Sequence, residues 1–172
     1  TPNMERLADL GIMRWVLALL FFIGFGIKAG AVPLHIWLPL AHPVAPTPAS
    51  ALLSAIMIKT GAYGIIRVFN LLFTPTDEHS LLWQTTAQFG LWLIWIGVIT
   101  MFVAAVLALV QQQAKRLLAY SSVSQMGYIL MGIGSAAYLG FDGAMGFASF
   151  SYHLLNHAFF KAGMFLMVGS IY

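Results

Sequence analysis

Three lysines lie within or beside long apolar stretches of the sequence, where a titratable amine is unusual. Lys28 ends one apolar run, whereas Lys59 and Lys161 each lie midway along another. A lysine near the centre of a bilayer costs about 2.5–3.5 kcal/mol on insertion scales, so such residues usually face a bundle interior or water. A low-dielectric site favours the neutral form of an amine, which allows proton exchange at physiological pH. We therefore interpret these lysines as candidates for a proton relay.

A second set of polar residues recurs every four positions in the last apolar stretch. Ser149, His153, His157 and Lys161 follow this spacing, and Asn156 borders them. Four helical residues advance about 400°, so the row drifts by only about 40° per step and forms one polar stripe. His153 and Lys161 would lie about 12 Å apart along the helix, a distance suited to transfer through bridging waters. The spacing thus predicts a proton path, and the competing interpretation is that these groups only hydrogen-bond neighbouring helices.

Metal ligation and interfacial anchoring are two further interpretations of these residues. His-x-x-x-His spacing fits two metal ligands on one helix face, but a closed site needs further His or carboxylate ligands. The acidic residues all lie near the ends or in connections: Glu5, Asp9, Asp77, Glu78 and Asp142. A bis-histidine haem would need His35 or His42 level with the stripe, and both are expected beyond the bilayer core. We predict no metal and no cofactor, and an interfacial anchor is the competing role for Lys28.

The composition indicates what kind of protein positions these groups. Hydrophobic residues make up 60% of the 172 positions, charged residues make up 8%, and the mean hydropathy is +0.88. A soluble domain has roughly 45–50% apolar and 25% charged residues, so the sequence indicates an all-α, polytopic membrane bundle. The net charge of +3 includes no basic run, which excludes a nucleic-acid-binding surface. The lack of cysteine excludes a disulfide framework and a thiol nucleophile.

Five apolar stretches are long enough to span a bilayer, for which a helix needs about 20 residues. They cover residues 11–29, 48–73, 83–110, 118–139 and 143–172, and we treat 1–172 as a single membrane domain. The sequence has no starting methionine and no polar tail after its last span, so we expect it to be part of a longer chain.

The connection between the first two spans is rich in helix breakers and histidines. Its prolines, together with the first proline of the next span, exclude a regular helix throughout: Pro33, Pro39, Pro43, Pro46 and Pro48. We predict that the first span breaks just beyond Lys28 and that Lys28 faces the bundle, because irregular backbone at membrane depth must be satisfied by protein or water. His35 and His42 would then pass protons between the aqueous side and Lys28.

Three motifs make the sequence resemble a known family. They read "KAGAVPLHIWLPLAHPVAPTPASALLSAIMIKTGAYGIIRVF", "KRLLAYSSVSQMGYILMGIG" and "SYHLLNHAFFKAGMFLMVGSIY", in this order. The sequence is similar over nearly its whole length to the proton-translocating antiporter-like subunits of respiratory complex I, Mrp-type cation/proton antiporters and membrane-bound hydrogenases. The resemblance implies that the five spans correspond to the seventh to eleventh of fourteen helices. It also implies that Lys28 matches the lysine of the family's broken helix, Lys59 that of the next helix, and Lys161 the lysine in "HAFFKA".

Leu40 departs from the pattern of many complex I members, which carry Asp there. In this respect the sequence looks more like the large membrane subunit of hydrogenase-4 or formate hydrogenlyase. The family's fifth-helix glutamate and its twelfth-helix lysine or glutamate have no counterpart in this sequence. The resemblance therefore implies the centre of a proton path without its two ends.

The resemblance also implies a function and a set of partners. It implies a proton-translocating subunit of a redox-driven complex in the cell (inner) membrane, which is not catalytic by itself. Its partners would be the lipid bilayer and the other membrane and peripheral subunits of a respiratory or hydrogenase complex. Two competing functions are a Na⁺/H⁺ antiporter subunit of the Mrp type and a structural membrane module whose polar residues only pack helices.

Overall fold

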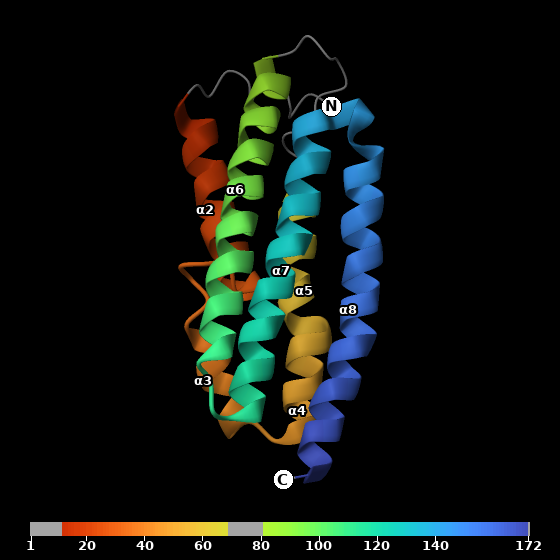
Figure 1. The fold of residues 1–172 in the computed structure, drawn as a ribbon. Helices are drawn as coiled ribbons and strands as arrows, with labels where there is room; N and C mark the ends of the chain where they lie inside the picture. Colours follow the sequence, from red (N-terminus) through yellow and green to blue (C-terminus); the bar gives the residue numbers. More distant parts are fainter. Residues whose placement is uncertain (1–11, 69–80, 172) are drawn as a thin grey trace.

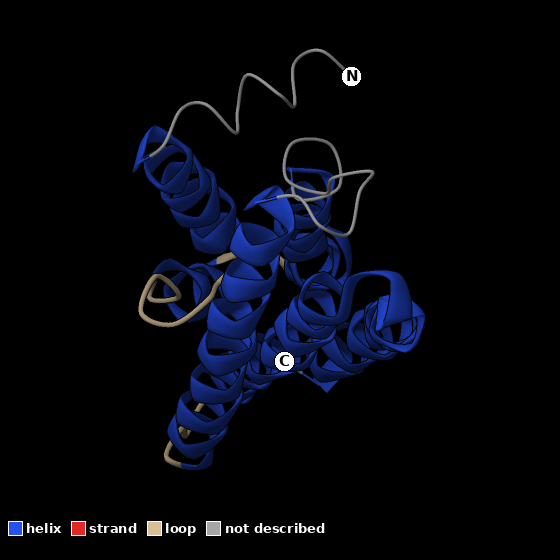
Figure 2. Cartoon of the chain, turned by 90° about the horizontal axis from the view of Figure 1, so that it is seen from above, coloured by secondary structure: helices blue, strands red, loops and turns tan. Residues whose placement is uncertain are grey.

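The computed structural model describes residues 12–68 and 81–171, which form a bundle of helices without any strand (Figures 1 and 2). Its elements are α2 (Ile12–Ala29), α3 (Trp37–Val44), α4 (Thr47–Leu52), the π-helical turn η1 (Leu53–Met57), α5 (Ile58–Val68), α6 (Leu81–Leu109), α7 (Ala114–Leu139), the 3-10 turn η3 (Gly140–Gly143) and α8 (Ala144–Ile171). The prediction of an all-α bundle with a broken first span is confirmed.

Three of the described helical stretches are long and apolar enough to cross a membrane: Thr47–Val68, Gln84–Leu109 and Ala144–Ile171. Trp15–Ala29 is a shorter apolar helix. The second predicted span corresponds to α4, η1 and α5 in succession, while its last part, 69–73, and most of the acidic connection after it lie outside the described residues.

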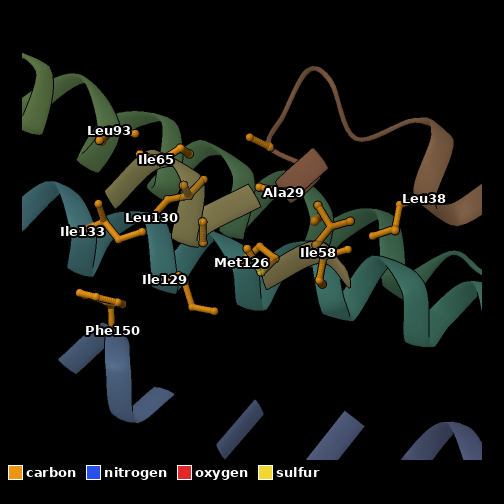
Figure 3. Close-up of a cluster of buried hydrophobic side chains, with 14 of the residues drawn as sticks. Ala29, Leu38, Ile58, Ile65, Leu93, Met126, Ile129, Leu130, Ile133 and Phe150 are labelled. Atoms are coloured by element: carbon orange, nitrogen blue, oxygen red, sulfur yellow. The ribbon is translucent and has the colours of Figure 1, made fainter. Parts of the chain in front are cut away.

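Helix α7 lies at the centre of the bundle and contacts α3, α5, α6 and α8 (Figure 1). It begins at Ala114, four residues before the predicted start, so Lys115 and Arg116 belong to its first turn. Both residue types favour a helix, which explains the longer element. The described core includes Met126, Ile129, Leu130 and Ile133 of α7, which Figure 3 shows near side chains of α5, α6 and α8.

Helices α6 and α7 approach each other closely at two pairs of glycines. A methyl group at Gly127 would lie 2.6 Å from Gly97 O and 2.6 Å from Met101 N. One at Gly134 would lie 2.6 Å from Gly90 O. Because these neighbours are backbone atoms, only glycine permits the approach, as small residues do generally between membrane helices.

Helix α2 ends directly after Lys28 in a Schellman motif. Gly30 has a positive φ of +74°, its N–H donates to Ile27 O at 3.1 Å, and the Ala31 N–H donates to Gly26 O at 3.0 Å. Beyond this end, the Val32 N–H donates to Thr100 Oγ1 at 3.1 Å. Protein groups therefore satisfy the backbone at the break, as irregular structure at membrane depth requires.

The junction of α3 and α4 depends on the lack of an N–H in proline. Pro46 follows His42 by four residues and cannot donate to its carbonyl, so Ser50 Oγ donates to His42 O instead, at 3.0 Å. Lys115 Nζ donates to Ala45 O at 3.1 Å, at the carboxyl end of α3 where free carbonyls favour a cation. The proline-rich connection thus contains a short helix, α3, that is held against α7.

Candidate functional site

The π-helical turn η1 creates the hydrogen-bonding site for Lys59. In an α-helix the Ile58 N–H would donate to Ser54 O, but here it donates to Leu53 O. Lys59 Nζ donates to the Ser54 carbonyl at 2.6 Å, and the Lys59 side chain is only 5% exposed. The irregular turn therefore presents a backbone oxygen to a lysine inside the bundle.

Lys161 of α8 is bonded to the amino-terminal half of α7. Its Nζ donates to the Leu118 carbonyl at 3.2 Å and to Ser121 Oγ, and the residue is 2% exposed. The same carbonyl also accepts hydrogen bonds from the hydroxyls of Ser121 and Ser122, each at 2.9 Å. Both buried lysines are thus held by oxygen acceptors of neutral groups.

A serine pair joins the surroundings of the two lysines. Ser54 Oγ and Ser122 Oγ lie 2.7 Å apart, and both residues are fully buried. Lys59 thus binds the backbone carbonyl of Ser54, whose hydroxyl contacts Ser122. Ser122 and Lys161 in turn donate to the same Leu118 carbonyl.

The two histidines of the predicted stripe lie next to each other on α8. The rings of His153 and His157 are nearly parallel, at 9°, with centroids 6.1 Å apart. His157 is buried and neither of its nitrogens has a hydrogen-bond partner among the described residues, and the same holds for Nε2 of the half-buried His153. Because buried polar atoms are normally hydrogen-bonded, these nitrogens are available to another group.

A groove of about 640 Å³ between α7 and α8 contains most of the stripe. Its polar lining residues come from both helices: Ser121, Gln125, His153, Asn156, His157 and Lys161. Ser149 is exposed one turn away and does not line the groove, because the stripe drifts around α8. The structure thus brings together every predicted stripe residue except Ser149. The part of the chain that it describes contains no cluster of three potential metal ligands.

Lys28 is not covered by the described helices, and its predicted orientation toward the bundle stays a prediction. Its side chain is exposed in the last turn of α2, where a positive charge interacts favourably with the helix dipole. Burial lowers the pKa of nearby His35, and a hydrogen bond to the Pro33 backbone raises it by a smaller amount. His35 instead packs edge-on against Tyr120 of α7.

His42 lies against Phe165 of α8, and its predicted role in proton access stays a prediction. Its ring is fully buried and stacks on Phe165, with centroids 4.6 Å apart. Burial lowers the pKa of His42 to about 4, and the positive charges of Lys161 and Lys115 contribute to the same direction. His42 is therefore neutral at physiological pH and belongs to the surroundings of Lys161.

The stability of the intact protein is expected to fall on acidification because of His42. In the unfolded chain a histidine binds a proton below pH 6.5, whereas folded His42 does so only below about pH 4. Between these values the unfolded state binds more protons, so this residue lowers the unfolding free energy by up to about 1.4 kcal/mol per pH unit. Thermal unfolding in detergent between pH 7 and 4.5 measures this, and His42→Gln should show a shallower dependence. Identical pH dependence in both proteins would contradict the assignment.

The sequence did not reveal the serines of the site. Ser121 and Ser122 stand side by side in "AYSSVS", and Ser54 lies in "LLSAIM", but isolated serines are common in membrane helices. The adjacent serine pair that ends the stretch "KRLLAYSS" was the available signal, since a polar pair is unusual on a central helix.

Comparison with known proteins places this chain in a family. The family model described as NADH:quinone oxidoreductase/Mrp antiporter, transmembrane, matches residues 3–172. Hydrogenase-4 component B of Escherichia coli (strain K12) is 43% identical over 159 residues, covering 89% of this chain and 22% of that protein. NADH-quinone oxidoreductase subunit M of the same strain is 39% identical over 175 residues, covering 100% of this chain and 31% of that protein.

Structural comparison agrees with the sequence comparison. The Mrp complex from Dietzia sp. DQ12-45-1b contains a similar chain, with a TM-score of 0.78 and 28% identity over 91% of this chain and 26% of the other. The chain thus spans less than a third of each of these proteins. Since the family model matches almost every residue, the chain is a multi-pass membrane protein that belongs to the NADH:quinone oxidoreductase/Mrp antiporter transmembrane family.

Proposed function

We propose that this chain forms the proton-conducting centre of an antiporter-like membrane subunit. The observation that supports the proposal is the pair of buried lysines, Lys59 and Lys161, each held by a backbone carbonyl inside an apolar bundle. Asp142 is the single acidic residue in the described part of the chain, and it is exposed in η3. A buried ammonium without a carboxylate is costly, so a lysine that can release its proton explains the arrangement better than a permanent charge.

The histidines extend the path from Lys161 along the groove between α7 and α8. An imidazole can accept a proton on one nitrogen and release it from the other, which suits His157 and His153 to successive transfers. Asn156, on the same groove, would orient the transferred groups. Three residues at the edges of the described bundle would give protons access from neighbouring parts of the complex. They are Ser149, one turn beyond the groove, and Lys28 and His35, at the break after α2. His42, whose ring stacks on Phe165 one turn beyond Lys161 on α8, would serve access or coupling on that side of Lys161.

The proposed partners follow from the names of the relatives. Hydrogenase-4 component B and NADH-quinone oxidoreductase subunit M are by name parts of larger enzymes. We infer that this chain works beside other membrane and peripheral subunits in the cell membrane, and that they supply the redox energy for transport. The single membrane domain predicted for 1–172 would then be one section of the proton path.

A Na⁺/H⁺ antiporter subunit of the Mrp type is the second candidate. The likeness to a chain of the Mrp complex favours it. Against it, the described groove presents one amine, two imidazoles, two amides and a hydroxyl but no carboxylate, and a protonated lysine repels a resident cation. Proton transport without sodium is therefore the preferred interpretation.

Proton uptake by liposomes that contain the purified, intact complex tests this function. We expect turnover to change the pH of the liposome lumen in sodium-free buffer. Lys161→Ala should reduce the rate of this change at least about tenfold. Lys115→Ala is the matched control, because Lys115 also binds a backbone carbonyl but lies outside the groove. A strict sodium requirement would favour the Mrp-type function. Equal rates in the wild type and Lys161→Ala, with Lys161→Ala assembling poorly, would favour a structural module.

A further inference from the structure

The two buried lysines are connected by a direct contact between hydroxyl groups. Ser54 and Ser122 are 68 residues apart in sequence, yet their Oγ atoms lie at 2.7 Å where η1 meets α7. On one side, Ser54 supplies the carbonyl that holds Lys59. On the other side, Ser122 Oγ and Lys161 Nζ both donate to the Leu118 carbonyl oxygen, at 2.9 and 3.2 Å. The serine pair is therefore the middle of the line that joins the lysines.

The hydroxyl groups of the serine pair can each donate one proton. A serine hydroxyl has one proton to donate, and the Ser122 hydroxyl donates it to Leu118 O at 2.9 Å. While Ser122 donates to Leu118 O, the bond between the serines uses the proton of Ser54; when the Ser122 hydroxyl turns toward Ser54, it is the donor instead. The pair can therefore be oriented toward either lysine, as a proton-conducting pair requires.

The other buried serines of the described residues donate to carbonyl groups and form no such line. Ser124 Oγ donates to Met101 O at 3.0 Å, which fastens α7 to α6, and Ser50 Oγ donates to His42 O. A carbonyl accepts a hydrogen bond but has no proton to pass on, whereas a hydroxyl both accepts and donates. The Ser54–Ser122 contact joins two hydroxyl groups and can therefore pass a proton on, which helix packing does not require.

We propose that the Ser54–Ser122 hydroxyl pair conducts the proton between Lys59 and Lys161, an inference that rests on the proposed function. Lys59 turns from the carbonyl to the hydroxyl oxygen of Ser54 and gives up one proton, and the Ser54 proton moves to Ser122 Oγ. The Ser122 proton then turns from Leu118 O to the neutral amine of Lys161. One proton leaves Lys59 and one reaches Lys161, and both serines keep a single proton with their hydroxyls reoriented. The two hydroxyl groups then turn back to their starting orientations before the next transfer.

Proton transport by variants of the intact complex in liposomes tests this proposal. We expect Ser54→Ala, Ser122→Ala and the double variant each to slow transport about tenfold, with assembly retained. The double variant should be no slower than either single variant, because both substitutions interrupt the same line. Ser122→Thr, which keeps the hydroxyl, should restore most of the rate. Ser122→Cys, close in volume but a weak donor, should not.

The control is Ser124→Ala, which removes another buried interhelical hydrogen bond of α7 and should leave the rate unchanged. Wild-type rates in the assembled alanine variants, with Lys59→Ala inactive, would overturn the serine path while leaving the proposed function intact. Wild-type rates in Lys59→Ala as well would overturn both. If the alanine variants do not assemble, the Cys and Thr variants decide: equal rates in these two would overturn the proposal.

Discussion

Lys59→Ala in the intact protein is expected to lose most proton translocation, at least about tenfold, while the protein still assembles. Lys59 is buried and its amine is bonded to one backbone carbonyl, so no ion pair among the described residues is broken by its removal. Removing the amine also removes a costly buried charge, which should leave folding intact or improve it. The loss should therefore appear in transport and not in the amount of assembled protein.

Lys59→Arg separates the charge of this residue from its ability to release a proton. An arginine stays protonated at any accessible pH, so this variant keeps a cation and should lose transport as fully as the alanine variant. Proton uptake by liposomes and the amount of complex recovered from membranes are the two measurements. Normal transport in both variants would refute the relay role of Lys59. Poor assembly without a specific transport defect would instead support a structural module.

Gly127→Ala is expected to destabilise the protein strongly through the contact of α6 and α7. The added methyl group would meet Gly97 O and Met101 N at 2.6 Å, and neither backbone atom can move without displacing a helix. Overpacking of this kind costs about 1–3 kcal/mol or more. The thermal unfolding midpoint of the purified, intact protein should fall, and Gly97→Ala, on the opposite side of the contact, should lower it similarly.

Gly163→Ala provides the matched control for this prediction. Gly163 also lies within a long helix, but a methyl group there has no neighbour within 4 Å among the described residues. Alanine is favoured over glycine in a helix by about 0.8–1.0 kcal/mol, so this variant should be as stable as the wild type or more stable. A destabilisation equal to that of Gly127→Ala would show that the close contact is not the cause.

The sequence predicts those parts of the site that depend on local geometry. His153, His157 and Lys161 share one helix, whose regular rotation places them on one face whatever the neighbouring helices are. The burial of Lys59 follows from the apolar residues on both sides of it, and the end of α2 follows from Gly30 and the prolines beyond. These predictions needed no knowledge of tertiary contacts.

The remaining features depend on contacts between distant segments. The exposure of Lys28 reflects which helices lie beside the end of α2, and the position of His42 reflects the fold of α3 against α7, which brings its ring onto Phe165 of α8. The contact of Ser54 with Ser122 joins residues that have no local pattern in common. The π-helical turn was not predicted either, because nothing in "LSAIM" distinguishes it from an ordinary apolar helix.

That turn also fixes the rotational phase of the helix that follows it. One residue corresponds to about 100° around a helix axis. The additional residue that η1 accommodates therefore rotates the side chains of α5 by about this angle relative to those of α4. The part before the turn, α4, packs on α8, whereas α5 packs on α2 through Gly61 and Gly64. Deleting one residue from Leu53–Met57 would rotate Lys59 and both glycines together away from their neighbours. Among relatives, the turn and the lysine should therefore be inherited or lost as a unit.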